Sequence, residues 1–192
     1  MSDLENDSAS SIDYEQDNSD EEYFKKKDEE DDNDEDFEPE IKKYCPVEKG
    51  NIINNRFKII KKLGWGRFSV VWMVADKVLL EKDDLNFEEA DIENIDKKYC
   101  VALKIYKSSA EYDEYYQNEK KIFDHLGNKK HPNIVNLLDS FYTKSEFGNH
   151  GCLVFELCGQ HLLKLLNRSD DGSLPLPIVK KIIKQTLEAI KF

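Results

Sequence analysis

The chain has 192 residues, which is room for one ordinary domain or for one domain and a tail, and its formal net charge is −12. The charge is uneven, because residues 1–40 hold 19 Asp and Glu against three Lys, a net of −16 that leaves about +4 for residues 41–192. No apolar run approaches the roughly 20 residues that cross a bilayer, and the acidic start is unlike a signal or transit peptide, so we expect no membrane partner.

The first 40 residues are predicted to form a disordered acidic tail. The run from Asp28 to Asp36 repels itself and has almost nothing to bury. The composition changes near residue 40, so we interpret residues 41–55 as a connector and residues 56–192 as a folded domain. The four cysteines have no C-x-x-C spacing, which predicts reduced thiols in a soluble intracellular protein rather than disulfides or zinc.

Two predicted strands joined by a glycine-rich turn open the domain. The first begins at Arg56 and ends at Gly64, and the second covers residues 69–74, where β-branched and aromatic residues dominate. The Gly-x-Gly between them indicates a hairpin with a glycine-rich tip. Residues 79–98 are rich in Asp and Glu, and we expect a solvated insertion loop that only connects strands.

The next predicted strand, residues 99–106, carries a lysine. Its period of two places Lys104 on one face with Ala102 and Tyr106. The strand is otherwise so apolar that a lysine there is unusual. Taken alone, Lys104 fits an edge strand from which the ammonium group reaches solvent.

A helix is predicted from Ser109 to Leu126, ended by Gly127, and it carries a carboxylate on its apolar stripe. That stripe contains Glu119 together with Tyr112, Tyr115, Ile122 and Leu126. An unpaired buried charge is costly, so Glu119 either reaches water at the edge of the stripe or has a cationic partner. A Glu119–Lys104 pair explains both unusual residues at once.

A second strand pair and two helices complete the prediction. The strands cover residues 135–142 and 151–157, around a turn at residues 146–149. A short helix follows at the leucines near residue 165. A longer amphipathic helix is opened by Pro175-Leu176-Pro177, and its apolar stripe comprises Ile178, Ile182, Ile183, Leu187 and Ile190.

The order of these elements predicts phosphate binding. A glycine-rich hairpin tip lets backbone N–H groups approach phosphate oxygens, a strand lysine clamps the phosphates, and a helix glutamate positions the lysine. A lone Gly-x-Gly is weak evidence, and the order of the elements provides the specificity. A dinucleotide-binding fold is excluded because a helix would have to follow the loop, whereas here a strand follows.

This ordered set resembles the N-lobe of a protein kinase, which implies an α+β fold. The resemblance implies a five-stranded antiparallel sheet with an αC helix over residues 56–157, then the hinge and the first C-lobe helices over residues 158–192. The chain is similar in particular to the SR-protein kinases. That similarity is carried by Leu63-Gly64-Trp65-Gly66-x-Phe68-Ser69, Val101-Ala102-Leu103-Lys104, Leu153-Val154-Phe155-Glu156-Leu157-Cys158 and Leu174-Pro175-Leu176-Pro177.

The resemblance implies a nucleotide site on this half of the domain. ATP phosphates would be covered by the glycine-rich loop, which comprises Gly64, Trp65, Gly66, Arg67, Phe68 and Ser69. The adenine would lie among Leu63, Val71 and Ala102, next to the gatekeeper Phe155 and the hinge backbone of Glu156 and Cys158. Lys104 would bind phosphate, and Glu119 would hold Lys104.

The resemblance also implies chemistry that these 192 residues do not contain. The family's catalytic loop, its metal-binding Asp-Phe-Gly and its substrate groove would lie beyond the equivalent of Phe192. We therefore assign no catalytic residue and no metal ligand, although a complete kinase would use Mg²⁺ with ATP. The expectation is a kinase fragment that is inactive by itself.

Family membership further implies Arg/Ser-rich splicing proteins as substrates, without direct nucleic-acid binding, in the cytoplasm and the nucleus. Two other interpretations remain open from the sequence. In one, the chain is a binding module that holds ATP or docks to partners without phosphoryl transfer. In the other, it is an interaction protein whose acidic tail contacts arginine-rich proteins by charge.

Overall fold

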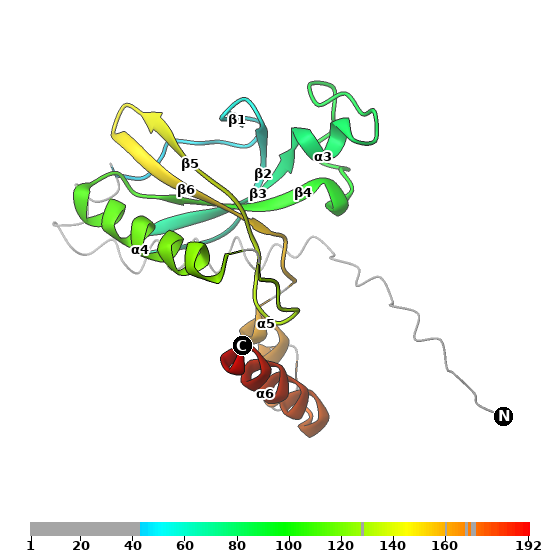
Figure 1. Cartoon of the computed structure of the whole chain (residues 1–192). Coiled ribbons are helices and arrows are strands. Elements are labelled where there is room, and N and C mark those ends of the chain that lie inside the picture. The colour runs from blue at the N-terminus through cyan, green and yellow to red at the C-terminus, as the bar shows by residue number, and fades with distance from the viewer. Residues whose placement is uncertain (1–42, 128, 160, 168, 170–171) are drawn as a thin grey trace. The chain divides into compact units, whose positions relative to one another are not determined.

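The computed structural model describes residues 43–192 except 128, 160, 168, 170 and 171 (Figure 1). The predicted acidic tail lies outside these described residues. Six antiparallel strands form one sheet in the order β1-β2-β3-β4-β6-β5. Their bounds are Ile52–Ile53, Phe57–Gly66, Ser69–Asp76, Cys100–Tyr106, Leu137–Ser145 and Gly148–Glu156, numbered β1 to β6 along the chain.

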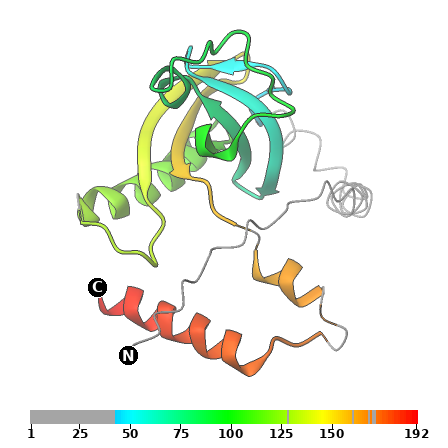
Figure 2. The same cartoon turned by 90° about the vertical axis from the view of Figure 1, so that its right-hand side faces the viewer.

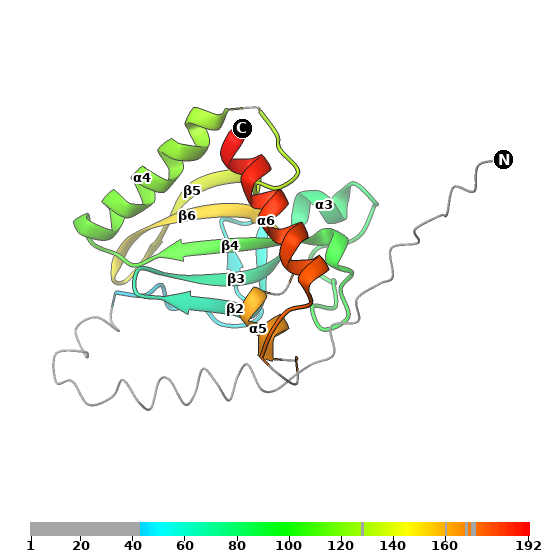
Figure 3. The same cartoon turned by 90° about the horizontal axis from the view of Figure 1, so that it is seen from below.

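Five of these strands are the expected ones, and β1 adds a two-residue strand within the connector. Ile52 and Ile53 of β1 pair with Lys58 and Phe57 of β2. The last two strands are longer than predicted and meet at a turn through Glu146 and Phe147. Figure 3 shows β2, β3, β4, β6 and β5 side by side, and Figure 2 shows how strongly they curve.

One face of the sheet holds the main hydrophobic core. In β4 the alternation predicted from the sequence is confirmed, because Val101, Leu103 and Ile105 are all buried there. The remaining core members come from the neighbouring strands: Ile53, Phe57, Ile59, Val74, Cys152 and Val154. Ala102, Lys104 and Tyr106 are therefore directed to the other face, where helix α4 packs against β4 and β6 (Figure 1).

Helix α4 begins and ends as the sequence predicts. It spans Ala110–Leu126, the Ser109 hydroxyl caps it by accepting from the Tyr112 backbone N–H at 3.3 Å, and Gly127 ends it at a φ of 58°.

The predicted buried stripe of α4 was partly wrong. Tyr112 is buried, but Tyr115 and Ile122 are 41% and 63% exposed, and Tyr116 is buried instead. The reason is Gly151 of β6, because a Cβ there would approach the Tyr116 ring to 2.3 Å. The sheet thus has a hollow at Gly151 that admits the Tyr116 ring.

The expectation of a purely solvated insertion at residues 79–98 was also wrong. A short helix, α3 (Lys77–Glu81), and a 3-10 turn, η1 (Lys97–Tyr99), lie at its ends. Leu80 and Phe87 are 2% and 3% exposed and form a second hydrophobic cluster with Ile60, Met73, Ala75 and Cys100 of the sheet. The acidic residues of the insertion face solvent while its few apolar residues build a small core.

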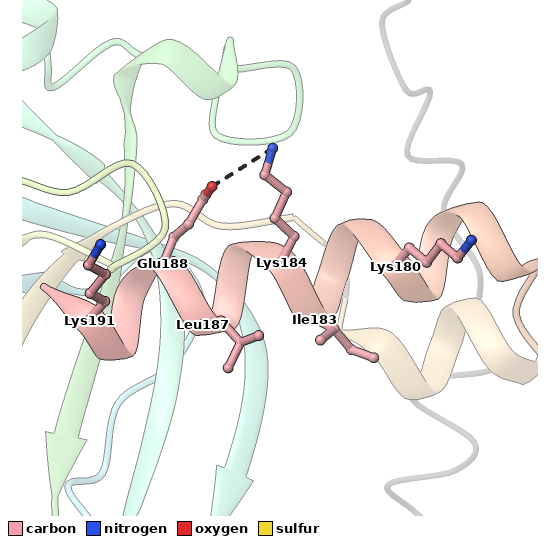
Figure 4. Close-up of a pocket in the computed structure, with 6 residues that line it drawn as sticks. All are labelled: Lys180, Ile183, Lys184, Leu187, Glu188 and Lys191. Atoms are coloured by element: carbon pink, nitrogen blue, oxygen red, sulfur yellow. Dashed lines mark ion pairs between the residues drawn. The ribbon is translucent and has the colours of Figure 1, made fainter.

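Two helices follow the sheet, α5 (Leu162–Asn167) and α6 (Leu176–Lys191), both close to their predicted positions. Figure 4 shows six residues of α6, with Ile183 and Leu187 on one side of the helix and the Lys184–Glu188 pair on the other. Leu187 and Ile190 are 60% and 76% exposed. None of the described helices is long and apolar enough to span a bilayer.

Candidate nucleotide-binding site

The strand register aligns the glycine-rich loop with the strand lysine. Gly64 of β2 lies opposite Val71 of β3, and Val71 lies opposite Lys104 of β4. Directly opposed residues of antiparallel strands project on the same face. The loop, Val71 and Lys104 therefore share the face on which α4 packs (Figure 3).

Gly64 and Gly66 are glycines that the protein's own packing does not require. Neither has a positive φ, and a Cβ at either position would meet no atom within 4 Å. Glycine in a strand costs conformational entropy without adding contacts. Open space above two such glycines fits the close approach of a ligand, as phosphate binding demands.

The predicted pair of Lys104 and Glu119 is present. The Lys104 Nζ lies 2.9 Å from Oε1 and 2.7 Å from Oε2 of Glu119. The two side chains keep 23% and 32% of their surface exposed, so the pair is accessible to a ligand. Lys104 does not point from an edge strand, because β4 lies between β3 and β6.

A third residue completes this cluster. The Tyr106 hydroxyl donates to Oε2 of Glu119 at 2.5 Å, and Lys104 Nζ lies 5.0 Å from the centroid of the Tyr106 ring. Burial, and to a lesser extent Glu119, raises the pKa of Tyr106 far above its usual range, so the phenol stays protonated as a donor. The sequence placed Tyr106 on the lysine's face but gave it no role.

Two of the residues expected around adenine, Ala102 and Phe155, lie opposite each other, two residues before Lys104 along β4. Ala102 of β4 lies opposite Met73 of β3 and Phe155 of β6. The Phe155 ring meets Phe123 of α4 edge-on, with centroids 5.3 Å apart. Leu63 lies in an irregular part of the β2–β3 pairing and is 39% exposed. Contact of these residues with adenine remains a prediction.

The hinge residues follow β6 directly. Glu156 is the last residue of β6, and its carboxylate accepts from the backbone and side-chain nitrogens of Asn136 at 2.7 and 2.5 Å. Cys158 is exposed and follows two residues later. The Glu156 side chain thus fixes the segment before β5, and contact of the Glu156 and Cys158 backbone with adenine stays a prediction.

The tip of the glycine-rich loop rests on α4. The Phe68 ring stacks on Tyr115 with centroids 4.3 Å apart, and the Arg67 guanidinium lies over Phe68. Phe68 was expected among the residues covering phosphates, but the structure directs its ring to the helix. The Tyr44 hydroxyl also donates to the Gly66 carbonyl at 3.1 Å, which fixes the tip from the connector.

The other loop residues behave differently from one another. Ser69 is buried where β3 begins. Trp65 lies near Lys62, and its indole Nε1 is buried without a hydrogen-bond partner among the described residues. The sequence gives no signal for the contacts of Tyr44 and Tyr115, because both lie outside the loop motif.

The described residues contain no group of three or more His, Cys, Asp or Glu side chains that could hold a metal ion.

The family model described as "Protein kinase domain" matches residues 90–192. "SRSF protein kinase 3" of Homo sapiens is 32% identical over 169 residues, which cover 83% of this chain and 27% of the relative. "Serine/threonine-protein kinase SRPK" of Physarum polycephalum is 33% identical over 152 residues, with 78% and 32% covered.

The chain spans about a quarter to a third of the length of these curated relatives. "Serine/threonine-protein kinase spk-1" of Caenorhabditis elegans is 36% identical over 157 residues, which cover 78% of this chain and 14% of that protein. Among solved structures, a kinase domain with 25% identity aligns with a TM-score of 0.49 over 67% of this chain and 32% of its own.

Proposed function

Because the chain belongs to the protein-kinase family and is similar to the SR-protein kinases, we propose that it supplies the ATP-binding part of a serine/threonine protein kinase. The observation that carries the proposal is the Lys104–Glu119 pair, joined at 2.7 Å from a central strand to α4 and aligned with Gly64. The pair is partly open to solvent and lies in line with the glycine-rich loop, which supports a role in binding phosphate.

Each residue contributes a separate part of nucleotide binding in this proposal. The backbone of Gly64 and Gly66 admits the phosphates, and Lys104 neutralises part of their charge. Glu119 keeps the Lys104 ammonium at the phosphate position. Ala102 and Phe155 border the adenine, with Mg²⁺ accompanying ATP in a complete kinase and supplying charge neutralisation during transfer.

The substrates are proposed from the relatives. Proteins named as SRSF protein kinases are among them, which supports Arg/Ser-rich splicing proteins as the substrate class. We propose that the protein acts in the cytoplasm and the nucleus, as its resemblance to the SR-protein kinases implies. Arg/Ser-rich segments are strongly basic, so their recognition by a complete kinase would depend on salt.

Nucleotide binding is the direct test. The full chain is titrated with a fluorescent ATP analogue, with and without Mg²⁺, and compared with Lys104→Met and Lys144→Met. Lys144 is an exposed lysine on β5 and serves as the charge-matched control. We expect saturable binding that Lys104→Met weakens at least about tenfold, because one preorganised charge contact is lost. Equal binding by Lys104→Met, or none by the unaltered chain, would refute the proposal.

We also propose that the 192-residue polypeptide by itself transfers no phosphate to an Arg/Ser peptide. Its sequence contains no His/Tyr-x-Asp or Asp-Phe-Gly motif, and those residues position the substrate hydroxyl and the metal. The assay is incorporation of labelled phosphate after stringent purification. Turnover that disappears in Lys104→Met would contradict this expectation.

The role of Lys104 in catalysis is tested in a longer protein that contains this sequence together with a catalytic loop. There, Lys104→Met is expected to lower phosphorylation of an Arg/Ser substrate at least about 100-fold, the scale of losing one preorganised electrostatic contact. Activity close to that of the unaltered protein would show that Lys104 is not the phosphate clamp.

A further inference from the structure

Two donors on one strand converge on a single carboxylate of α4. Lys104 and Tyr106 lie two residues apart in β4, so both project on the same face. Lys104 Nζ reaches both oxygens of Glu119, and the Tyr106 hydroxyl reaches Oε2. Glu119 is therefore held by one mobile charged donor and one donor on an aromatic ring.

The Tyr106 ring is fixed far more firmly than the lysine. It is 2% exposed, and it meets the Tyr116 ring edge-on with centroids 5.8 Å apart. Tyr116 precedes Glu119 by three residues, so both lie on the same side of α4. Tyr106 thus contacts one face of the helix twice, through its ring and through its hydroxyl.

A bound phosphate would add hydrogen-bond acceptors for Lys104 but none for Tyr106. An ammonium group has three donors, and Glu119 and the phosphate oxygens would have to share them. A neutral phenol hydroxyl near the pair keeps its bond to Glu119 whichever acceptors the lysine takes. The Glu119 carboxylate then keeps its hydrogen bond to Tyr106, and this bond continues to hold α4 close to β4.

We propose that Tyr106 is a positioning residue of the nucleotide site, one that holds Glu119 of α4 in reach of Lys104 through its hydroxyl. This inference rests on the proposed nucleotide binding. It extends the Lys104–Glu119 pair to a three-residue unit in which a strand tyrosine sets the position of the helix. Removal of the hydroxyl alone loosens Glu119 and, through it, Lys104.

The structure provides a matched control on the same helix. The Tyr142 hydroxyl donates to Asp113 at 2.5 Å and accepts from the side-chain amide of Gln117 at 2.6 Å. Tyr142→Phe therefore removes a hydroxyl from a carboxylate of α4, as Tyr106→Phe does, without touching Lys104 or Glu119. A general weakening of α4 would affect both variants, whereas loss of Glu119 positioning affects only Tyr106→Phe.

The first measurement is a double-mutant cycle on the dissociation constant of the fluorescent ATP analogue, with the full chain. We expect Tyr106→Phe to weaken binding roughly threefold to tenfold, a part of what one charge-assisted hydrogen bond is worth. In a Glu119→Ala background, the same substitution should change nothing, because the hydroxyl has lost its acceptor. Tyr142→Phe should bind as the unaltered chain does.

The second measurement needs no nucleotide. Acylation of Lys104 by an amine-reactive ester, followed residue by residue with mass spectrometry, reports how well Glu119 holds the ammonium group. Tyr106→Phe and Glu119→Ala should both accelerate the reaction at Lys104, and Tyr142→Phe should not. The exposed Lys144 serves as the internal reference.

The outcomes separate this inference from the proposed function. Unchanged affinity and acylation in Tyr106→Phe would overturn it. An equal loss of affinity in the Glu119→Ala background would also overturn it, because Tyr106 would then act independently of Glu119. If the unaltered chain binds no nucleotide, the proposed function fails, and acylation alone decides whether Tyr106 holds the pair.

Discussion

His150 shows how one buried residue makes the stability of this sheet depend on pH. It is fully buried in β6, with Nδ1 2.8 Å from the Tyr106 carbonyl and Nε2 2.8 Å from the Ser145 hydroxyl. A carbonyl only accepts, so Nδ1 carries the proton and Nε2 accepts from Ser145. Burial lowers the pKa of His150, since the neutral ring fits this site.

The pH dependence follows from that shift. Below a pH of about 6.5, the unfolded chain binds a proton on this residue that the folded chain does not bind. The free energy of unfolding should therefore fall as pH drops through 6.5 and continue to fall toward the lower folded pKa. Urea unfolding between pH 5 and 8 measures this.

His150→Asn is the comparison for that prediction. It removes the titrating group but keeps a side-chain amide that can donate to the Tyr106 carbonyl. The variant should be less stable at pH 8, and its stability should decline less steeply toward pH 5. Parallel curves for the two proteins would show that His150 is not the group responsible.

At the scale of elements, Arg56 joins three parts of the fold. Its guanidinium makes two bonds of 2.7 Å to Asp76 at the end of β3 and one of 2.8 Å to Asp139 of β5. Asp76 is almost fully buried and also caps α3 by accepting from the Val78 backbone N–H. The Arg56 side chain thus fixes the end of β3, which the insertion follows in the chain.

Arg56→Met is expected to lower the free energy of unfolding by about 3–5 kcal/mol, because it leaves the Asp76 carboxylate buried without its cation. The control is Lys49→Met, which removes an exposed pair with Glu93 and should cost no more than about 1 kcal/mol. Denaturant unfolding at pH 7 measures both. A cost for Arg56→Met no larger than that of the control would show that water screens Asp76.

The insertion and the loop tip are connections between elements that the sequence did not indicate. Phe87 of the insertion packs under the sheet near Met73, and Phe68 of the loop tip packs on Tyr115 of α4. Both rings join segments far apart in the chain. The first contact joins the insertion and α3 to the sheet, and the second joins the glycine-rich loop to α4.

At the scale of the whole molecule, α6 leaves an apolar stripe in contact with water. Ile183, Leu187 and Ile190 are 53%, 60% and 76% exposed. Apolar side chains of this size gain roughly 1.5–3 kcal/mol each on full burial, so the three that are more than half exposed forgo up to about 9 kcal/mol together. That is comparable with the entire stability of a typical domain, about 5–15 kcal/mol.

The 192-residue polypeptide is therefore expected to self-associate through α6. Leu187→Glu should reduce the apparent mass in light scattering and the binding of a hydrophobic dye. Gln185→Glu adds the same charge two residues away, on the side of α6 opposite Leu187, and should have little effect. A monodisperse monomer with a reversible, cooperative melt would show that the stripe is covered.

Strand β4 and its lysine show which structural features could be predicted from the sequence. The period of two in β4 predicted which side chains enter the core, and it placed Lys104 opposite them. The need of a buried charge for a partner then predicted the pair with Glu119. These inferences succeeded because they depend on local periodicity and on the cost of an isolated charge, which hold before the chain folds.

The tertiary structure decided what periodicity leaves open. Steps of three and four define an apolar stripe on α4 that contains Tyr115, but Tyr116 is adjacent, and only the hollow at Gly151 selects Tyr116 for burial. The insertion contains few apolar residues, and their burial depends on the sheet surface that they meet. The hydroxyl of Tyr106 reaches Glu119 because a strand and a helix are set at a particular distance. Sequence by itself determined five strands, the helices α4, α5 and α6, and their order. The spacing between elements, which arises only on packing, determined which polar groups meet.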